Sequence, residues 1–488
     1  MIPFGRLQPD AGELQPGICM TADGVLPLVA GYGPAPGLFV SAGAVALNAN
    51  PVGVISLVLN DGAWKVYAFT ATDIGVLQSD DSWSYLTAGL NVTAGDDVSA
   101  IHFGSYLVFT NTTDGLKYYN VEVPAGFTSV TAAGAPRFIF IWGTQIVGLD
   151  CLDTAGNRDN RLLRVSDFNS FTNWTDGGAD YQPLEDGGAL QWGCDLQDGG
   201  ALVLQSRAVR LLQFGNAGGG ALFSQRKIAD GLGSVGARSA VNYSGMAFWL
   251  ATDGFCKFTR GGGIERIGAG RIDEWFFSQV DTSALDTVQG QIDPYRKMVW
   301  WRYKHVDTVS TTAFEDMIGY SWQFDCWVTS SVSTTYLASI ATPGVTLDSM
   351  DALYGTLDSI DAPLDSRTFQ GGEPVFSALN GSLKFGTFSD SNQAAVLATS
   401  TTNSPVTGRI GWATPIDDAA GGTLALGVKD QPSDAITWKT AAAKGRAGRV
   451  PLRGRGTNVA FRYTIPAGED WSYARGIDHI QAAAGGPK

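Results

Sequence analysis

A short pattern of strand, turn and strand recurs along this chain and limits what it can fold into. Its clearest copies lie at 66–77, 107–119 and 247–258, where an aromatic-rich strand enters a turn containing Thr and Asp and a second strand follows. Apolar and polar residues alternate with period two on either side of the turn, and Asp or Gly in the turn tolerates the left-handed backbone of a tight hairpin. A repeated β-hairpin without helical periodicity predicts an all-β chain.

Further alternating segments raise the number of expected sheets to roughly six or seven. They lie at 138–149, 161–166, 202–214, 297–303, 318–328 and 383–388. Gly accounts for 62 of the 488 residues and charged residues for only 16%, which is typical of a chain with many turns. Radial repetition leaves few exposed sheet edges, so we expect an irregular β-propeller of about six blades with an additional β-rich platform.

Changes in residue composition and pattern divide the chain into four parts. Residues 1–40 are rich in Pro and Gly and are expected to form an extended arm, and 41–345 the propeller. Residues 346–372 carry repeated Leu-Asp-Ser triplets that are expected to form a connector, and 373–488 a C-terminal β-rich domain that builds the platform with the arm. The triplets could coordinate a cation, but they lack the Gly and bidentate Glu of a calcium loop, so turn capping is the favoured interpretation.

The charge balance argues against a general nucleic-acid-binding protein. The chain has 33 Lys and Arg against 47 Asp and Glu, a net charge of −14 and a pI near 4.6, and such a surface repels phosphate. The first residues contain neither a signal peptide nor an apolar stretch of spanning length, so we expect no export and no membrane insertion. Five scattered Cys residues predict buried thiols and no disulfide framework.

The sequence lacks the spacings that most enzymes need. His102, His305 and His479 are isolated, and no G-x-S-x-G nucleophile motif occurs. A G-x-G-x-x-G match at 231–236 follows polar residues and precedes a strand, so it predicts a loop between blades and not a dinucleotide site. We therefore expect no enzymatic activity, cofactor or metal, with the carboxylate pair of a glycosidase propeller as the main alternative.

Two groups of residues are candidates for function. A basic cluster near the C-terminus could grip phosphate, but its interleaved glycines and lack of a stacking pattern favour pairing with an acidic neighbouring subunit. The interface candidates in this cluster are Arg446, Arg449, Arg453 and Arg455. Glycine-rich loops on a rigid scaffold are the candidates for a mobile gate. These are the stretches from Gly215 to Gly220 and from Gly261 to Gly263.

Several segments follow one another in a distinctive order. At the start these are Phe4, 7–10, Pro27 and 30–38; in the middle, 164–168, 173–175, 202–209 and 245–255; and near the end, 366–372, 453–455 and 461–471. Their order resembles the tail nozzle, or tail hub, proteins of short-tailed double-stranded DNA bacteriophages. The opening carries Leu7-Gln8-Pro9-Asp10 where that family has Leu-Pro-Asp. The resemblance spans nearly the whole chain and carries no catalytic residues.

The resemblance implies a structural virion protein assembled in the host cytoplasm. It implies a homohexamer at the distal end of the tail, below the adaptor ring under the portal and next to tail fibres or a tail needle. Such a nozzle forms the last part of the DNA-ejection channel, allows transient non-specific passage of DNA, and closes the channel until infection. The alternatives are a carbohydrate-binding or glycoside-cleaving propeller of a tail fibre or cell surface, and a generic intracellular propeller scaffold.

Overall fold

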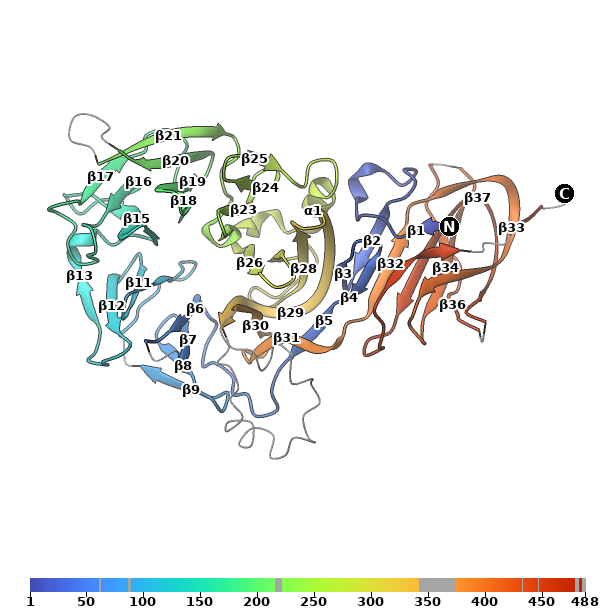
Figure 1. Ribbon diagram of the computed structural model, residues 1–488, viewed down its shortest axis with the longest axis horizontal. Coiled ribbons are helices and arrows are strands. Elements are labelled where there is room, and N and C mark those ends of the chain that lie inside the picture. Colours follow the sequence, from blue (N-terminus) through green and yellow to red (C-terminus); the bar gives the residue numbers. More distant parts are fainter. Residues whose placement is uncertain are drawn as a thin grey trace.

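The structure is a computed structural model that describes residues 1–60, 63–86, 89–215, 222–341, 374–431, 433–445, 447–478 and 482–484. Within these residues the chain is all-β, apart from one short α-helix and four 3₁₀ turns. A ring of blades occupies the left of Figure 1 and a β-sandwich the right, with strands of the N-terminal arm between them. The predicted fold, an irregular β-propeller with a β-rich platform, is confirmed.

Five blades are antiparallel four-stranded sheets built from consecutive strands. The first blade is β6 (Gly53–Val58), β7 (Trp64–Phe69), β8 (Ile74–Leu77) and β9 (Trp83–Leu86). The second is β10 (Ser99–Phe103), β11 (Tyr106–Asn111), β12 (Gly115–Asn120) and β13 (Thr128–Val130), followed by η2 (Thr131–Ala133). The third is β14 (Phe138–Trp142), β15 (Gln145–Leu152), β16 (Arg158–Val165) and β17 (Asp180–Pro183).

The fourth and fifth blades follow the same plan. The fourth is β18 (Leu190–Asp195), β19 (Gly200–Gln205), β20 (Ala208–Phe214) and β21 (Phe223–Asp230). After η3 (Ala237–Ser239), the fifth is β22 (Val241–Tyr243), β23 (Met246–Ala251), β24 (Gly254–Thr259) and β25 (Gly263–Arg266). The G-x-G-x-x-G segment is the loop between these two blades, as predicted.

The recurring hairpins form because their turn side chains satisfy backbone groups that the strands leave open. In the second blade, Asn111 Oδ1 accepts the N–H groups of Thr113 and Asp114 at 2.9 and 2.7 Å. In the first blade, Thr70 Oγ1 accepts the N–H of Asp73 at 2.9 Å. Such local capping fixes the register of each hairpin without tertiary contacts, which is why the sequence pattern was sufficient to predict them.

The sixth blade is less regular. It follows α1 (Asp273–Gln279) and η4 (Thr282–Thr287) and consists of β26 (Gln289–Asp293), β27 (Met298–Tyr303), β28 (Phe314–Ser321) and the first half of β29 (Cys326–Ala341). The second half of β29 leaves β28 and pairs with β30 (Pro374–Asn380). β31 (Phe385–Asn392) then pairs with β30 and with β5 (Pro36–Phe39) of the arm. These four strands form a seventh sector of the ring.

A buried glutamine holds this seventh sector against the sixth blade. Gln289 Nε2 donates to the carbonyl of Leu337 at 2.9 Å, and Gln289 Oε1 accepts the Leu337 N–H at 3.0 Å. The side chain thus replaces a neighbouring strand for one residue of β29. On the other side of the sector, Ala338 and Ile340 pack with Val66 and Ala68 of the first blade. The ring closes through these contacts.

The C-terminal residues form two packed sheets that share a long strand. Their strands are β32 (Ala395–Thr399), β33 (Thr402–Asp417), β34 (Thr423–Lys429), β35 (Thr437–Trp438), β36 (Ala442–Ala443), β37 (Val450–Ile465), β38 (Ala474–Asp478) and β39 (Ala482–Ala484). The arm contributes β1 (Ile2–Pro3), η1 (Pro9–Ala11), β2 (Cys19–Asp23), β3 (Val25–Pro27) and β4 (Tyr32–Pro34). β33 pairs with β37 in one sheet and with β38 in the other.

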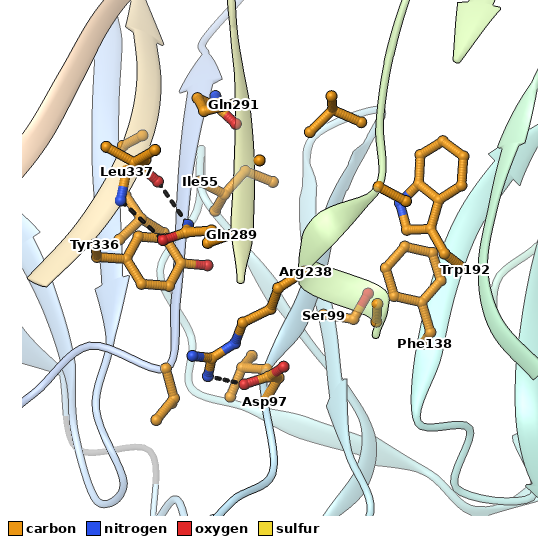
Figure 2. Close-up of a pocket in the computed structure, with 18 of the residues that line it drawn as sticks. Ile55, Asp97, Ser99, Phe138, Trp192, Arg238, Gln289, Gln291, Tyr336 and Leu337 are labelled. Atoms are coloured by element: carbon orange, nitrogen blue, oxygen red, sulfur yellow. Dashed lines mark hydrogen bonds and ion pairs between the residues drawn. The ribbon is translucent and has the colours of Figure 1, made fainter. Parts of the chain in front are cut away.

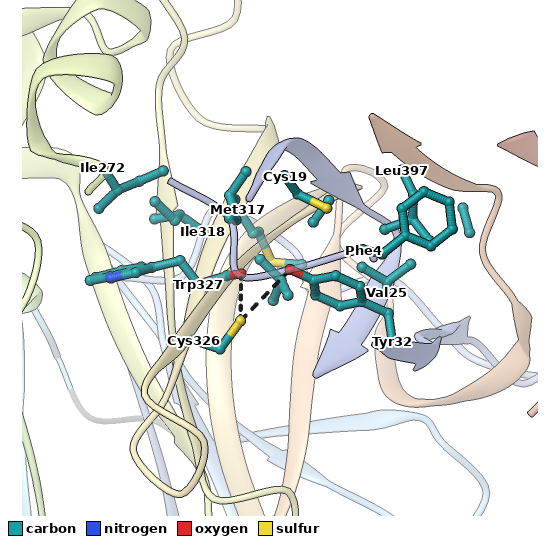
Figure 3. Close-up of a cluster of buried hydrophobic side chains, with 14 of the residues drawn as sticks. Phe4, Cys19, Val25, Tyr32, Ile272, Met317, Ile318, Cys326, Trp327 and Leu397 are labelled. Atoms are coloured by element: carbon teal, nitrogen blue, oxygen red, sulfur yellow. Dashed lines mark hydrogen bonds between the residues drawn. The ribbon is translucent and has the colours of Figure 1, made fainter. Parts of the chain in front are cut away.

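The arm joins the propeller to the sandwich in one hydrogen-bonded sheet. β2 pairs with β32 of the sandwich and, at Asp23 and Thr329, with β29 of the sixth blade. Figure 3 shows the junction, where Phe4 and Tyr32 of the arm lie between Trp327 of the propeller and Leu397 of the sandwich. The hydroxyl of Tyr32 donates to the carbonyl of Gly5 at 2.7 Å. A single hydrophobic core therefore runs through both bodies.

The structure divides the chain differently from the expected boundaries. Residues 374–392, expected in the C-terminal domain, pair in the seventh sector of the propeller. The arm belongs to both bodies, because β5 pairs in the propeller while β1 pairs in the sandwich. The Leu-Asp-Ser connector, 346–372, lies outside the described residues.

Candidate functional site

The predicted interface arginines that are described lie on one exposed part of the sandwich. Arg453 and Arg455 alternate with partly or fully buried residues on β37, so both side chains leave the same face of the strand. Arg449 is exposed just before β37, and its guanidinium lies 4.4 Å from the centre of the Trp412 ring on β33. Arg446 lies outside the described residues.

This basic face, defined here as Arg449, Arg453 and Arg455, makes no ion pair within the described part of the chain. Arg462 lies 4.1 Å from the centre of the Trp438 ring. An arginine over an indole keeps its charge and most of its donors available to a partner. Arg and Trp are among the residue types enriched at the energetically important positions of protein interfaces.

Lys444, which the sequence placed in the same basic cluster, is structural. Its ammonium group pairs with the Asp417 carboxylate and donates to the carbonyl of Ala419 at 2.7 Å. Its side chain is 12% exposed. The position of a lysine in a basic stretch did not reveal that it points inward, because this depends on the turn before β34.

The glycines proposed as gates lie on the outer parts of two blades. Gly261 and Gly263 form the turn between β24 and β25, with φ angles of 75° and 81° that only glycine adopts readily. Gly215 directly follows β20, and its N–H donates to the carbonyl of Leu222. Gly220 lies outside the described residues. None of the described three lines the axial cavities described next, and their role as a gate stays a prediction.

One feature that the sequence did not reveal is a cavity on the propeller axis. It has a volume of about 310 Å³ and is lined by residues of every inner strand of the ring, including the second half of β29. Figure 2 shows Tyr336 and Gln289 on one side, Phe138 and Trp192 on the other, and Arg238 reaching between them. A second axial hollow continues along β10, β14 and β18 and shares Ser99, Phe138 and Trp192 with the first.

Charge is unevenly balanced at one end of this axial cavity. Arg238 pairs with Asp97, and its guanidinium lies 6.0 Å from the centre of the Tyr336 ring. Behind them Arg302 is 4% exposed; it donates to the carbonyl of Thr312 at 2.8 Å and has no carboxylate partner within the described residues. Burial, and secondarily the charge of Arg238, lowers the pKa of Arg302 to about 9. Arg238 therefore lines this end of the cavity, and a second, buried arginine lies behind the wall.

The cysteine thiols are buried, and the described residues contain no cluster of metal ligands. All five thiols are free and buried, and burial raises the pKa of Cys151 and Cys256 to about 12, which keeps them protonated. No cluster of three or more metal-ligating side chains occurs among the residues that the structure describes. No helix in the same part of the chain is long and apolar enough to cross a bilayer.

Comparison with known proteins finds similarity only among solved structures. No protein-family model and no curated protein matches the sequence. Among solved structures, a streptogramin B lyase is similar with a TM-score of 0.41 and 11% identity, covering 72% of this chain and 97% of that one. The β-propeller domain of Myceliophteria thermophila Cps50 (Swd1) has a TM-score of 0.42 and 6% identity, covering 72% and 98%. The WD40 β-propeller domain of Doa1 gives 0.36 and 9%, covering 63% and 90%.

Proposed function

We propose that this chain is the tail nozzle protein of a short-tailed double-stranded DNA bacteriophage. In this role it is a non-enzymatic virion component that lines the distal DNA-ejection channel and keeps it closed until infection. The ordered segments that resemble this family support the proposal, as described for the sequence. The structural observation that carries it is the continuous sheet from the sixth blade through β2 of the arm into the sandwich.

That sheet makes the chain a single stiff unit. The arm is bonded to both bodies. Toward the propeller, Asp10 accepts the N–H groups of Glu274 and Trp275 of α1 at 2.9 and 2.8 Å. Toward the sandwich, Glu13 pairs with the buried Lys429 at 2.6 Å. A pressurised channel requires subunits that do not hinge, whereas two domains joined by a free linker move by default.

The exposed basic face supplies a surface for a neighbouring subunit. A closed ring of identical chains needs two unlike patches that fit each other, and a chain of net charge −14 offers acidic surface to meet these arginines. We propose a homohexamer in which the sandwiches meet through the basic face. The adaptor ring, the tail fibres or needle, and transiently the DNA are the other partners.

Net negative charge also suits a conduit, because a wall that bound DNA would stall it. Particles that lack this protein are expected to package DNA, to lose it afterwards and to fail in infection. The purified chain is expected to bind duplex DNA weakly, with a strong dependence on salt, or not at all. Tight sequence-specific binding, or mutant particles that retain DNA and infect, would contradict the proposal.

The second candidate is a carbohydrate-binding or glycoside-cleaving propeller. The axial cavity favours it, because aromatic rings and the amides of Gln289 and Gln291 line one hollow. A glycan array and a hydrolysis screen on the full chain distinguish the two. Hydrolysis that a single carboxylate substitution abolishes would establish the second candidate and exclude a purely structural role.

A further inference from the structure

The axial cavity has the dimensions and the polarity of a small-molecule site. Its volume of about 310 Å³ lies at the lower end of the range of about 300–1,000 Å³ for ligand pockets. It is lined by residues of all the inner strands, which hold its walls in place. The Arg238 and Asp97 side chains are 26% and 24% exposed, so the cavity is open to solvent at their end.

Arg238 carries more hydrogen-bond donors than the described residues use. A guanidinium has five N–H groups, and the structure pairs one of its nitrogens, Nη2, with Asp97. No other hydrogen bond of this guanidinium occurs within the described part of the chain. The unused donors lie in a wall that also contains the Tyr336 ring, as Figure 2 shows. Planar donors of this kind bind a carboxylate through two parallel hydrogen bonds.

The surrounding charge favours an anion over a cation. Arg302 and Gln289 lie directly opposite each other on β27 and β26, so their side chains share one face of the sixth blade. Gln289 reaches the second half of β29 from that face, next to Tyr336. Arg302 adds a buried positive charge there without a carboxylate partner in the described residues. Two positive charges, those of Arg238 and Arg302, therefore lie near Tyr336, and the structure pairs only Arg238 with a carboxylate among the described residues.

The wall of the cavity opposite Tyr336 is aromatic. Phe138 and Trp192 lie with ring centroids 6.4 Å apart and both line the cavity. Gln291 lines it as well, and its side-chain amide makes no hydrogen bond within the described residues. Apolar contact is thus available to a ring, and an amide to its polar substituents.

We propose that the axial cavity binds a small organic carboxylate with a ring body, whose carboxylate pairs with Arg238 and whose ring lies against Phe138 and Trp192. Asp97 occupies part of the guanidinium in the free protein and competes with the incoming carboxylate. The site is independent of the proposed nozzle function, because it uses no residue of the basic face.

Calorimetric titration of the full chain with benzoate, glucuronate, acetate and inorganic phosphate tests this. Benzoate or glucuronate is expected to bind saturably. Acetate lacks the ring and is expected to have an affinity at least about tenfold lower. Arg238→Gln should weaken the binding about tenfold or more, because a charge-assisted hydrogen bond is lost. Arg238→Lys keeps the charge but not the planar donors and should give an intermediate affinity.

The decisive comparison uses the two partners of one ion pair. If Arg238 binds the ligand, Asp97→Asn removes the competing carboxylate and should tighten binding, while Arg238→Gln weakens it. If the ion pair is purely structural, both Asp97→Asn and Arg238→Gln should weaken binding. Arg260→Gln is the matched control, since Arg260 pairs with Asp198 at 2.8 Å outside the cavity. Three results would overturn the proposal. They are an equal loss of affinity from both variants, binding of phosphate but of no ring carboxylate, and the absence of any saturable binding.

Discussion

The propeller and the sandwich use arginine in opposite ways. Most propeller arginines pair with a carboxylate of the same chain; examples are Arg137 with Asp96, Arg158 with Asp150, Arg266 with Asp253 and Arg296 with Asp293. In the described part of the sandwich, no arginine makes such a pair, and two stack on tryptophan instead. A charge that is paired within the chain is already occupied, whereas an exposed unpaired donor is available to another chain. We infer that the propeller is the internally balanced body and the sandwich the assembling one.

The largest expected effect is on assembly. The triple variant Arg449→Glu, Arg453→Glu, Arg455→Glu should lower subunit association by about a hundredfold or more, because attraction to an acidic neighbour becomes repulsion. The loss should be greater at low salt, where screening is weakest. Sedimentation velocity across a salt series measures it.

The fourth blade offers two exposed arginines whose charge can be reversed as a control for net charge. Arg207 and Arg226 are exposed, and Arg207→Glu/Arg226→Glu should leave association unchanged. Association that falls equally in both variants would show that net charge, and not the basic face, governs assembly.

The second effect is on stability and should be confined to the propeller. Arg210 is 4% exposed and donates to Gln205 Oε1 at 2.8 Å and to the carbonyl of Asp186 at 2.9 Å. Arg210→Met should lower the free energy of unfolding by about 2 kcal/mol, because the buried Gln205 Oε1 and the partly buried Asp186 carbonyl lose their donor. Arg453→Met on the sandwich should change it by less than about 0.5 kcal/mol. Urea unfolding of both variants measures the difference, and equal losses would remove the contrast between the two bodies.

A third effect depends on pH and concerns a propeller carboxyl without an arginine partner in the described residues. Asp273 begins α1, accepts the N–H of Phe255 at 3.1 Å, and is 6% exposed. Burial raises the pKa of Asp273 to about 6. The folded state therefore holds this proton more tightly than the unfolded state does, and its contribution to stability is lost as the pH rises from about 4 through 6.

Asp273→Asn removes this pH-dependent loss of stability, because the amide stays neutral at every pH. Its oxygen can still accept the Phe255 N–H. The variant should be about 1 to 2 kcal/mol more stable than the parent at pH 7.5 and nearly equal to it at pH 4, after allowance for partial screening. Thermal unfolding at both pH values measures this. A stability difference that does not depend on pH would show that the Asp273 carboxyl titrates normally.

The smallest effect tests the stacked arginines themselves. A double-mutant cycle of Arg462→Ala and Trp438→Ala should give a coupling energy of about 0.5 to 1 kcal/mol in the unassembled chain. A coupling near zero would mean that the indole does not orient the guanidinium. Urea unfolding of the four chains provides the values.

The part of this fold that sequence predicts is the part set by local chemistry. Hairpins such as 107–119 carry their own turn and alternation, so their register needs no distant partner. The pairing of β5 with β31 joins residues that lie far apart in the chain, and neither strand carries a signal for the other. The seventh sector and the double role of the arm therefore could not be predicted.

The same distinction applies to the sites. Exposed arginines on alternate positions of a strand can be found in the sequence, as Arg453 and Arg455 were. The axial cavity cannot, because Asp97, Arg238 and Tyr336 come from separate sectors of the ring and meet only when it closes. No spacing in the sequence brings these residues together.

The most direct test of the central claim is electron microscopy of the purified full chain at low salt, combined with a mass measurement. We predict rings with six-fold symmetry and a mass six times 51.6 kDa, in which the sandwiches, with the basic face, form the subunit contacts. Particles that stay monomeric at every concentration, or rings in which the propellers alone touch and the basic face points to solvent, would contradict it.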